Sequence, residues 1–152
     1  MKEIFPIAPA GSSAMLLLLP IAVLLVAGLV LVIITATAIG RGSVEVSPGN
    51  MRIKAPLYGR SIPLTSLIPE QARVIDISRE NELRPKWRTN GIGLPNYAAG
   101  WFKLQNGEKA LLLVTDKKKV LYLPTRDGYS ILLSAVEPER LLALLKNPMV
   151  AN

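Results

Sequence analysis

Three strand-like runs follow one another in residues 109–134, which read KALLLVTDKKKVLYLPTRDGYSILLS. Each run is rich in Leu, Val, Ile or Tyr, as strands are; the runs are Lys109–Thr115, Lys119–Pro124 and Tyr129–Ser134. Polar turns at 116–118 and 127–128 separate them, and connections this short favour consecutive antiparallel strands. Residues 111–114 are apolar on both faces, which predicts a central strand.

The strand pattern continues toward the N-terminus. Gly100–Leu104 predicts a strand, joined to the run at 109 by an Asn106-Gly107 hairpin turn of type I′. Earlier alternating or short apolar runs predict strands at 44–46, 51–55, 58–64 and 72–77, with a Pro-Gly-Asn turn at 48–50. Between 78 and 99 the pattern breaks, and Asn90-Gly91, Gly93 and Leu94-Pro95-Asn96 are interpreted as interruptions of the backbone.

The C-terminal end changes to helical spacing. Leu141, Leu142, Leu144 and Leu145 form a one-sided stripe after Pro138, a residue tolerated in a first helical turn. This predicts a helix over about 137–146. The predicted fold class is therefore mainly β: seven or eight strands over about 43–134, followed by one α-helix that covers the sheets.

A continuous apolar run precedes this domain. Residues 4–40 carry no charged side chain, and residues 15–39 are almost entirely Leu, Val, Ile and Ala. As a helix these 25 residues would be about 37 Å long, more than the hydrocarbon core of a bilayer. We therefore predict a short N-terminal tail over 1–14, one transmembrane helix over 15–39, and a domain over 41–152 that works at the surface of a cell membrane.

Basic residues predict the orientation of this anchor. Only Lys2 and the terminal amine precede the run, whereas four basic residues follow closely: Arg41, Arg52, Lys54 and Arg60. The positive-inside rule then predicts a cytoplasmic domain, with an extracytoplasmic one as the alternative. The small residues at 36 and 38 also fit a cleaved signal peptide, but the run is about twice as long as a signal-peptide core, which favours a retained anchor.

Composition excludes several classes of function. The chain has no Cys and no His, so it lacks disulfides, thiolate chemistry, the commonest general base and the commonest transition-metal ligand. We predict no enzyme activity, no cofactor, no metal and no small-molecule substrate. Residues 41–152 carry the whole net charge of +7. Beside a bilayer this charge favours anionic lipid headgroups, and tethering disfavours nucleic acid.

Two basic segments are candidates for surface binding. If residues 83–88 are extended, Arg84, Lys86 and Arg88 share one face, with Trp87 on the other. They form either a polar edge over a core tryptophan or a basic rim that faces lipid phosphate or an acidic partner. The second segment, Lys117, Lys118 and Lys119, is either a solvated hairpin tip or a contact for a headgroup or partner.

Two other groups of side chains, an aromatic pair and an acidic group, also have alternative interpretations. Trp101 and Phe102 point to opposite faces of their strand, so one is expected in the core and the other is free to be exposed. The carboxylates of Asp76, Glu80 and Glu82 are interpreted as solvated charge rather than as a catalytic cluster.

Several segments resemble the bacterial PH (pleckstrin-homology-like) domain proteins of unknown function. They are LYGRSIPL at 57–64, WRTNGIGLP at 87–95, GWFKL at 100–104 and NGEKA at 106–110, and the resemblance runs from about 43 to 146. It implies a PH-like barrel of two bent antiparallel sheets closed by a C-terminal helix, in a group whose members commonly carry transmembrane helices. It implies no catalytic residues and no agreed ligand. The first hairpin loop, 47–50, lacks the basic cluster that phosphoinositide-binding PH domains use.

These observations predict a membrane-anchored PH-like binding module. It is expected to dock a protein partner or anionic lipid headgroups at the membrane surface. The alternative is a small structural subunit that stabilises a larger membrane protein complex through its span and its domain.

Overall fold

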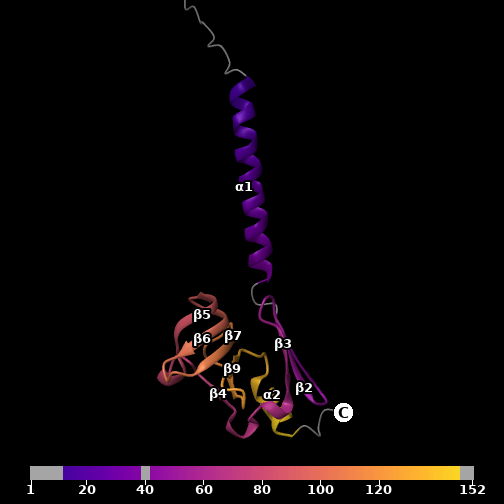
Figure 1. Ribbon diagram of the computed structural model, residues 1–152, viewed down its shortest axis with the longest axis vertical. Helices are drawn as coiled ribbons and strands as arrows, with labels where there is room; N and C mark the ends of the chain where they lie inside the picture. Colours follow the sequence, from indigo (N-terminus) through magenta and orange to yellow (C-terminus); the bar gives the residue numbers. More distant parts are fainter. Residues whose placement is uncertain (1–11, 39–41, 148–152) are drawn as a thin grey trace, which may run out of the picture. The chain divides into compact units, whose positions relative to one another are not determined.

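The structure, a computed structural model, describes residues 12–38 and 42–147 (Figure 1). The chain divides into two units, Met1–Ile39 and Gly40–Asn152, and each is described by itself.

The first unit contains one helix, α1, at Ser12–Ala38. Its first residue lies three positions before the start of the predicted helix, and its last residue lies one position before the predicted end. Its described side chains are apolar and exposed all round the helix, from Leu16 to Ile34. Among the described residues, however, no helix qualifies by length and apolar character as one that crosses a membrane, so the predicted span is not supported by the structure.

The second unit is mainly β, as predicted, with two sheets and a C-terminal helix. Its described part contains nine strands rather than seven or eight: β1 Ser43–Ser47, β2 Asn50–Lys54, β3 Arg60–Pro63, β4 Arg73–Ile75, β5 Pro85–Leu94, β6 Tyr97–Leu104, β7 Lys109–Val114, β8 Val120–Pro124 and β9 Ser130–Leu133. Short 3₁₀ turns link β3 to β4 and β4 to β5. The helix α2, Pro138–Lys146, starts on its proline within one residue of the predicted position.

The smaller sheet is an antiparallel meander in the order β1-β2-β3. Val46 lies opposite Met51, and the predicted turn at Pro48-Gly49 is present, with Gly49 at a φ of 87°. Alternation places Met51 and Ile53 on the inner face of this sheet, where both are buried.

The larger sheet has the order β4-β8-β9-β7-β6-β5. The expectation of consecutive antiparallel strands is wrong at β8, because β8 does not fold back on β7 but pairs with β4 and β9. Strand β9 then lies parallel to β7, between it and β8. The backbone N–H groups of Thr115 and Asp116 donate to Ser134 Oγ at 3.2 and 3.1 Å, so the end of β9 fixes the connection after β7. The two sheets also stay separate, so the closed barrel is not observed.

Strand β5 corrects a second prediction, because it continues through Asn90, Gly91 and Gly93, with a register shift between Arg88 and Asn90. Gly91 lies opposite Gly100 of β6, and a Cβ on Gly91 would lie 2.5 Å from the carbonyl oxygen of Ala99. Gly100 has a φ of 112°. These glycines are therefore required where two strands approach closely, not where the chain turns.

Successive side chains of the central strands point to opposite faces of the larger sheet and so contribute to two separate hydrophobic cores. The first core lies between the two sheets and α2; it includes Ile53, Leu111, Leu123, Leu133 and Leu141. The second core lies on the opposite face of the larger sheet; it includes Leu83, Phe102, Leu112, Val120 and Leu132. Strand β7 contributes to both cores and lies between β6 and β9, which confirms the predicted central strand.

Candidate binding groove and basic surface

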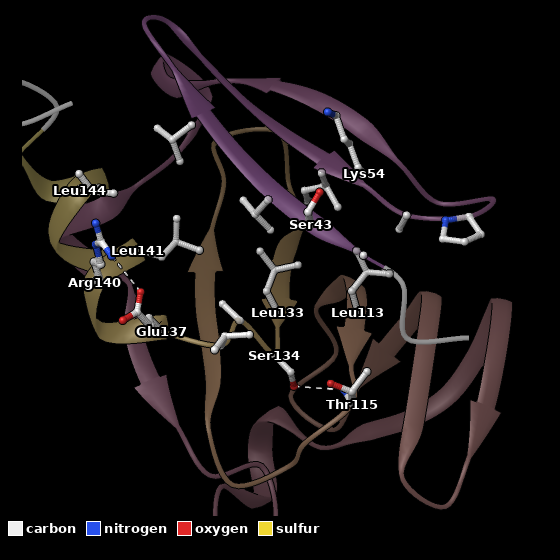
Figure 2. Close-up of a pocket in the computed structure, with 18 of the residues that line it drawn as sticks. Ser43, Lys54, Leu113, Thr115, Leu133, Ser134, Glu137, Arg140, Leu141 and Leu144 are labelled. Atoms are coloured by element: carbon white, nitrogen blue, oxygen red, sulfur yellow. Dashed lines mark hydrogen bonds and ion pairs between the residues drawn. The ribbon is translucent and has the colours of Figure 1, made fainter. Parts of the chain in front are cut away.

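A groove of about 480 Å³ opens between β1–β2, the ends of β7 and β9, and the start of α2 (Figure 2). Its apolar lining comes from all of these elements: Val44, Val46, Ile53, Leu113, Leu133, Leu141 and Leu144. This volume falls within the range of roughly 300–1,000 Å³ typical of ligand sites. No feature of the sequence indicated the groove, because it depends on how α2 packs beside the small sheet.

The charged side chains at the groove are already paired. Lys54 forms an ion pair with Glu45. Arg140 Nη1 lies 3.1 Å from Glu137 Oε2 (Figure 2). Val136, beside them, is 100% exposed. The groove therefore presents an apolar interior and a nearly neutral rim, which suits an apolar occupant better than an anion.

Strand β1 adds a second recognition element to the groove. It is an edge strand that pairs only with β2 in the described sheets, while Ser43, Val44 and Val46 line the groove. The outer backbone groups of an edge strand are available to pair with another extended chain.

The first predicted basic segment does not form one alternating face. Arg84 precedes β5, and its guanidinium donates to the carbonyl oxygens of Ile77 (3.2 Å) and Ser78. A register shift between Pro85 and Trp87 leaves Lys86 as an extra residue, with Nζ 5.5 Å from the Trp87 ring. Arg88 lies opposite Phe102. Trp87 is 55% exposed, so the interpretation as a core tryptophan is wrong.

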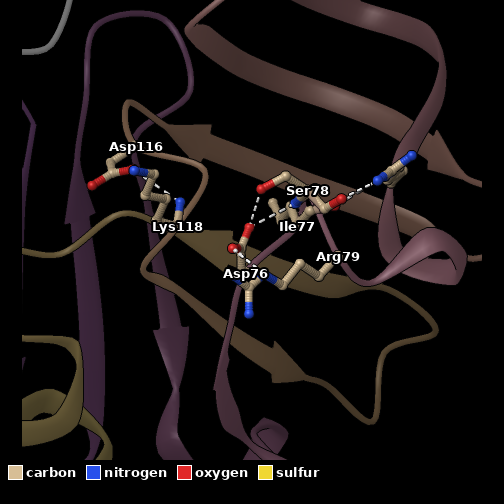
Figure 3. Close-up of polar contacts among 7 residues, drawn as sticks. Asp76, Ile77, Ser78, Arg79, Asp116 and Lys118 are labelled. Atoms are coloured by element: carbon tan, nitrogen blue, oxygen red, sulfur yellow. Dashed lines mark hydrogen bonds and ion pairs between the residues drawn. The ribbon is translucent and has the colours of Figure 1, made fainter.

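The second predicted segment, Lys117 to Lys119, is exposed between β7 and β8. The Lys117 carbonyl accepts from the Ile77 N–H at 2.9 Å, so these lysines and Arg84 approach the same short stretch of chain. Asp116 accepts from the Lys118 N–H nearby (Figure 3). Arg84 and Lys117 thus border the same stretch, Ile77–Ser78, whereas Lys86 and Arg88 lie along β5. That these residues bind a partner stays a prediction.

Asp76 balances the positive charge at this end of the domain. Its carboxylate accepts from the hydroxyl and the backbone N–H of Ser78, and lies 3.5 Å from Arg79 (Figure 3). These hydrogen bonds, with the nearby charges of Arg79 and Lys118, lower the pKa of Asp76. Glu80, from the same group of acids, forms an ion pair with Arg73. Among the residues described, no three acidic side chains are grouped so as to hold a metal ion.

A cluster of aromatic and basic side chains was missed by the sequence analysis. The rings of Trp101 and Tyr129 meet edge to face at 5.2 Å. Arg60 lies 5.0 Å from the Trp101 ring and 5.9 Å from the Tyr129 ring, and Lys109 Nζ lies 4.5 Å from the Trp101 ring. Strands β3, β6 and β7 and the turn before β9 bring these residues together, so their spacing in the sequence gave no signal. Phe102 is the buried partner, while Trp101 is half-buried, as their opposite faces predicted.

A polar network closes the second core. The Tyr122 hydroxyl donates to Glu108 Oε2 at 3.1 Å, and Ser130 Oγ donates to the same oxygen at 2.9 Å. Burial raises the pKa of Tyr122, and the neighbouring Glu108 carboxylate adds to this effect. The network satisfies polar groups at the edge of the core, and nothing in it resembles a nucleophile with its base.

Comparison with known proteins gives one match. The family model described as bacterial PH domain matches residues 42–148, which is most of the chain and nearly all of the second unit. No curated protein and no solved structure matches the chain significantly. PH-like domains are typically binding modules without catalytic activity, in agreement with a groove and an exposed basic surface. The chain belongs to the bacterial PH domain family.

Proposed function

We propose that this protein is a membrane-anchored, non-catalytic binding module. Its PH-like domain docks an extended, apolar segment of a protein partner in the groove beside α2. The groove itself is the observation that carries this proposal.

The proposed anchor rests on the sequence and on the character of α1. Residues 15–39 contain no charged side chain. Helix α1 has 27 residues, which corresponds to a length of about 40 Å. Large apolar side chains exposed along it, such as Leu24 and Leu25, are costly in water and stable in lipid. The proposed cell-membrane location and cytoplasmic domain follow from this helix and from the basic residues after it.

The choice of an extended peptide follows from the two elements that border the groove. Edge strand β1 offers unpaired backbone groups, and the apolar floor accepts alternate side chains of an added strand. The rim charges of Lys54 and Arg140 are paired with the carboxylates of Glu45 and Glu137, which disfavours an anionic headgroup at this site.

Site-specific photo-crosslinking in native membranes tests the proposal. A photoreactive amino acid replaces Val136, whose fully exposed side chain can be changed without opening the core. A matched variant carries it at Leu94, which is exposed on β5 and does not line the groove. We expect one protein adduct from position 136 that is absent from position 94. Co-expressed unlabelled wild-type chain should reduce this adduct by competing for the partner, whereas an unlabelled Val136→Asp chain should not.

Peptide mapping of the adduct gives the decisive outcome. An adduct within an apolar segment of a partner supports docking in the groove. Equal labelling from both positions, or labelling of lipid alone from position 136, contradicts it.

A further inference from the structure

We propose that a second surface, which we name the tryptophan face, docks on the phosphate headgroups of an anionic bilayer. It consists of Trp87, Trp101, Lys103, Lys109 and Arg60. The inference goes beyond the groove, and it rests on the proposed function in one respect: the anchor that keeps the domain at a bilayer.

Strand register places most of this face on one side of the larger sheet. Trp87 of β5 lies opposite Lys103 of β6, and Lys103 lies opposite Lys109 of β7. Residues that lie opposite each other point to the same side of a sheet. Trp101 is two residues from Lys103 and shares its side, and the Lys109 ammonium lies 4.5 Å from the Trp101 ring.

The cations of this face have no acidic partners. Within residues 12–38 and 42–147, the ion pairs do not include Arg60, Lys103 or Lys109. The nearest acid in sequence, Glu108, directs its carboxylate to the hydroxyls of Tyr122 and Ser130 at the edge of the second core, and forms no ion pair with Lys109. The basic side chains of the face are therefore complementary to lipid phosphate.

Repulsion within the face also favours an anionic occupant. Lys103 and Lys109 are like charges at directly opposed positions, an arrangement that destabilises a sheet. Arg60 and Lys109 both lie against the ring of Trp101, at 5.0 and 4.5 Å from its centre, so their separation is comparable to or less than the screening length of about 10 Å at 0.1 M salt. An array of phosphates opposite them removes this repulsion.

The aromatic residues favour a bilayer over other anionic partners. Trp87 is 55% exposed, with the Lys86 ammonium 5.5 Å from its ring. Amphipathic aromatic rings beside Lys or Arg are typical of the membrane–water interface. Single-stranded nucleic acid also stacks on aromatic rings beside basic residues, so it is the alternative that the experiment must exclude.

Tryptophan fluorescence of the full chain tests this inference directly, because its only two tryptophans, Trp87 and Trp101, belong to the face. The chain is reconstituted into lipid nanodiscs of phosphatidylcholine, with or without phosphatidylglycerol, and emission is quenched with acrylamide. We expect quenching about two-fold weaker in the anionic discs, with the difference lost near 1 M salt, where the screening length is only about 3 Å.

Two double variants with the same change in net charge separate this face from general electrostatics. Lys103→Glu with Lys109→Glu should abolish the difference between the discs. Lys117→Glu with Lys118→Glu, in the exposed connection after β7, should preserve it. Equal quenching in both kinds of disc, or equal effects of the two double variants, overturns the inference. Stronger shielding of the tryptophans by a single-stranded RNA oligomer than by anionic discs overturns it as well.

The same samples report on the anchor separately. Neutral discs offer no anionic headgroups to the tryptophan face, so recovery of the chain with them tests insertion of α1 alone. A chain that stays only with anionic discs would contradict the anchor while supporting the tryptophan face. A chain that stays with both discs, but with equal quenching, would contradict the face alone.

Discussion

Gly100 lies where β5 and β6 approach each other closely. A Cβ at this position would lie 2.5 Å from the carbonyl oxygen of Asn90 and 2.9 Å from the ring of Tyr58. Its φ of 112° is also one that side-chain-bearing residues rarely adopt. The close pairing of β5 and β6 at this point thus depends on the missing side chains of Gly91 and Gly100.

Gly100→Ala should therefore destabilise the domain by about 1–3 kcal/mol, since it combines backbone strain with a clash against rigid backbone. Gly93→Ala is the matched control, because its Cβ would meet only the Phe102 ring at the ordinary distance of 3.6 Å. Thermal unfolding of the full chain in mild detergent measures both. Equal melting temperatures for the two variants would show that the crossing tolerates a side chain.

Tyr122 makes the stability of the domain sensitive to alkaline pH. Its raised pKa means that the folded chain holds the phenolic proton to higher pH than the unfolded chain does. The resulting stabilisation is fully present below the unfolded pKa of about 10, and it is lost as the pH rises through the folded pKa.

Tyr122→Phe should cost about 1 kcal/mol at pH 7, because the hydrogen bond to Glu108 is lost. The difference between the wild type and this variant should then shrink as the pH is raised above 10. Urea unfolding at a series of pH values measures it, with Tyr97→Phe as a control outside the network. A difference that grows with pH would contradict the assigned direction of the pKa shift.

Strands β6 and β7 carry an opposed pair of lysines whose effect on stability is testable by itself. Lys103→Glu converts the Lys103–Lys109 repulsion into an opposite-charge pair across the two strands. We expect the free energy of unfolding to rise by about 0.2–1 kcal/mol. Lys117→Glu, outside the strands, serves as the control. A lower stability for Lys103→Glu would show that the two ammonium groups do not repel each other in the folded domain.

Alternation and turn residues predicted most elements but not their order in the sheet. The apolar faces of residues 109–134 are sufficient to identify β7, β8 and β9, because burial on both sides leaves a local pattern. Whether β8 returns to β7 or crosses to β4 is decided by contacts distant in sequence, such as those of Ser134 with Thr115 and Asp116. The parallel pairing of β7 with β9 was therefore not readable from local spacing.

The interpretation of glycines as interruptions of the backbone was wrong in β5, again because the reason lies in contacts between strands. Asn90-Gly91 and Gly93 resemble turn residues, yet their freedom is used for close packing of two strands. The Asn106-Gly107 prediction was half correct: Gly107 has a φ of 88°, but Asn106 has no positive φ, so the turn is not type I′. Gly107→Val remains destabilising because the φ of Gly107 is positive.

For the candidate sites, too, local properties were predictable from the sequence and contacts between distant segments were not. The sequence predicted a basic, binding domain of the bacterial PH family, since charge, missing residue types and segment resemblance are local properties. The groove and the tryptophan face were not predicted, because each combines strands and a helix that are far apart in the chain.

At the scale of the whole molecule, a proposed apolar anchor precedes a PH-like binding domain. The second unit follows the α1 unit directly in the chain. If α1 crosses a bilayer, the domain is therefore tethered to that membrane. Partner docking and headgroup docking then act on one tethered domain.

Extraction of native membranes with alkaline carbonate tests this central claim most directly, because it removes proteins held by charge and leaves those with an inserted helix. We predict that the chain stays in the membrane pellet at full length, including the variant with Lys103→Glu and Lys109→Glu. Release of the chain into the aqueous supernatant, or its recovery there without the apolar segment, would contradict the account.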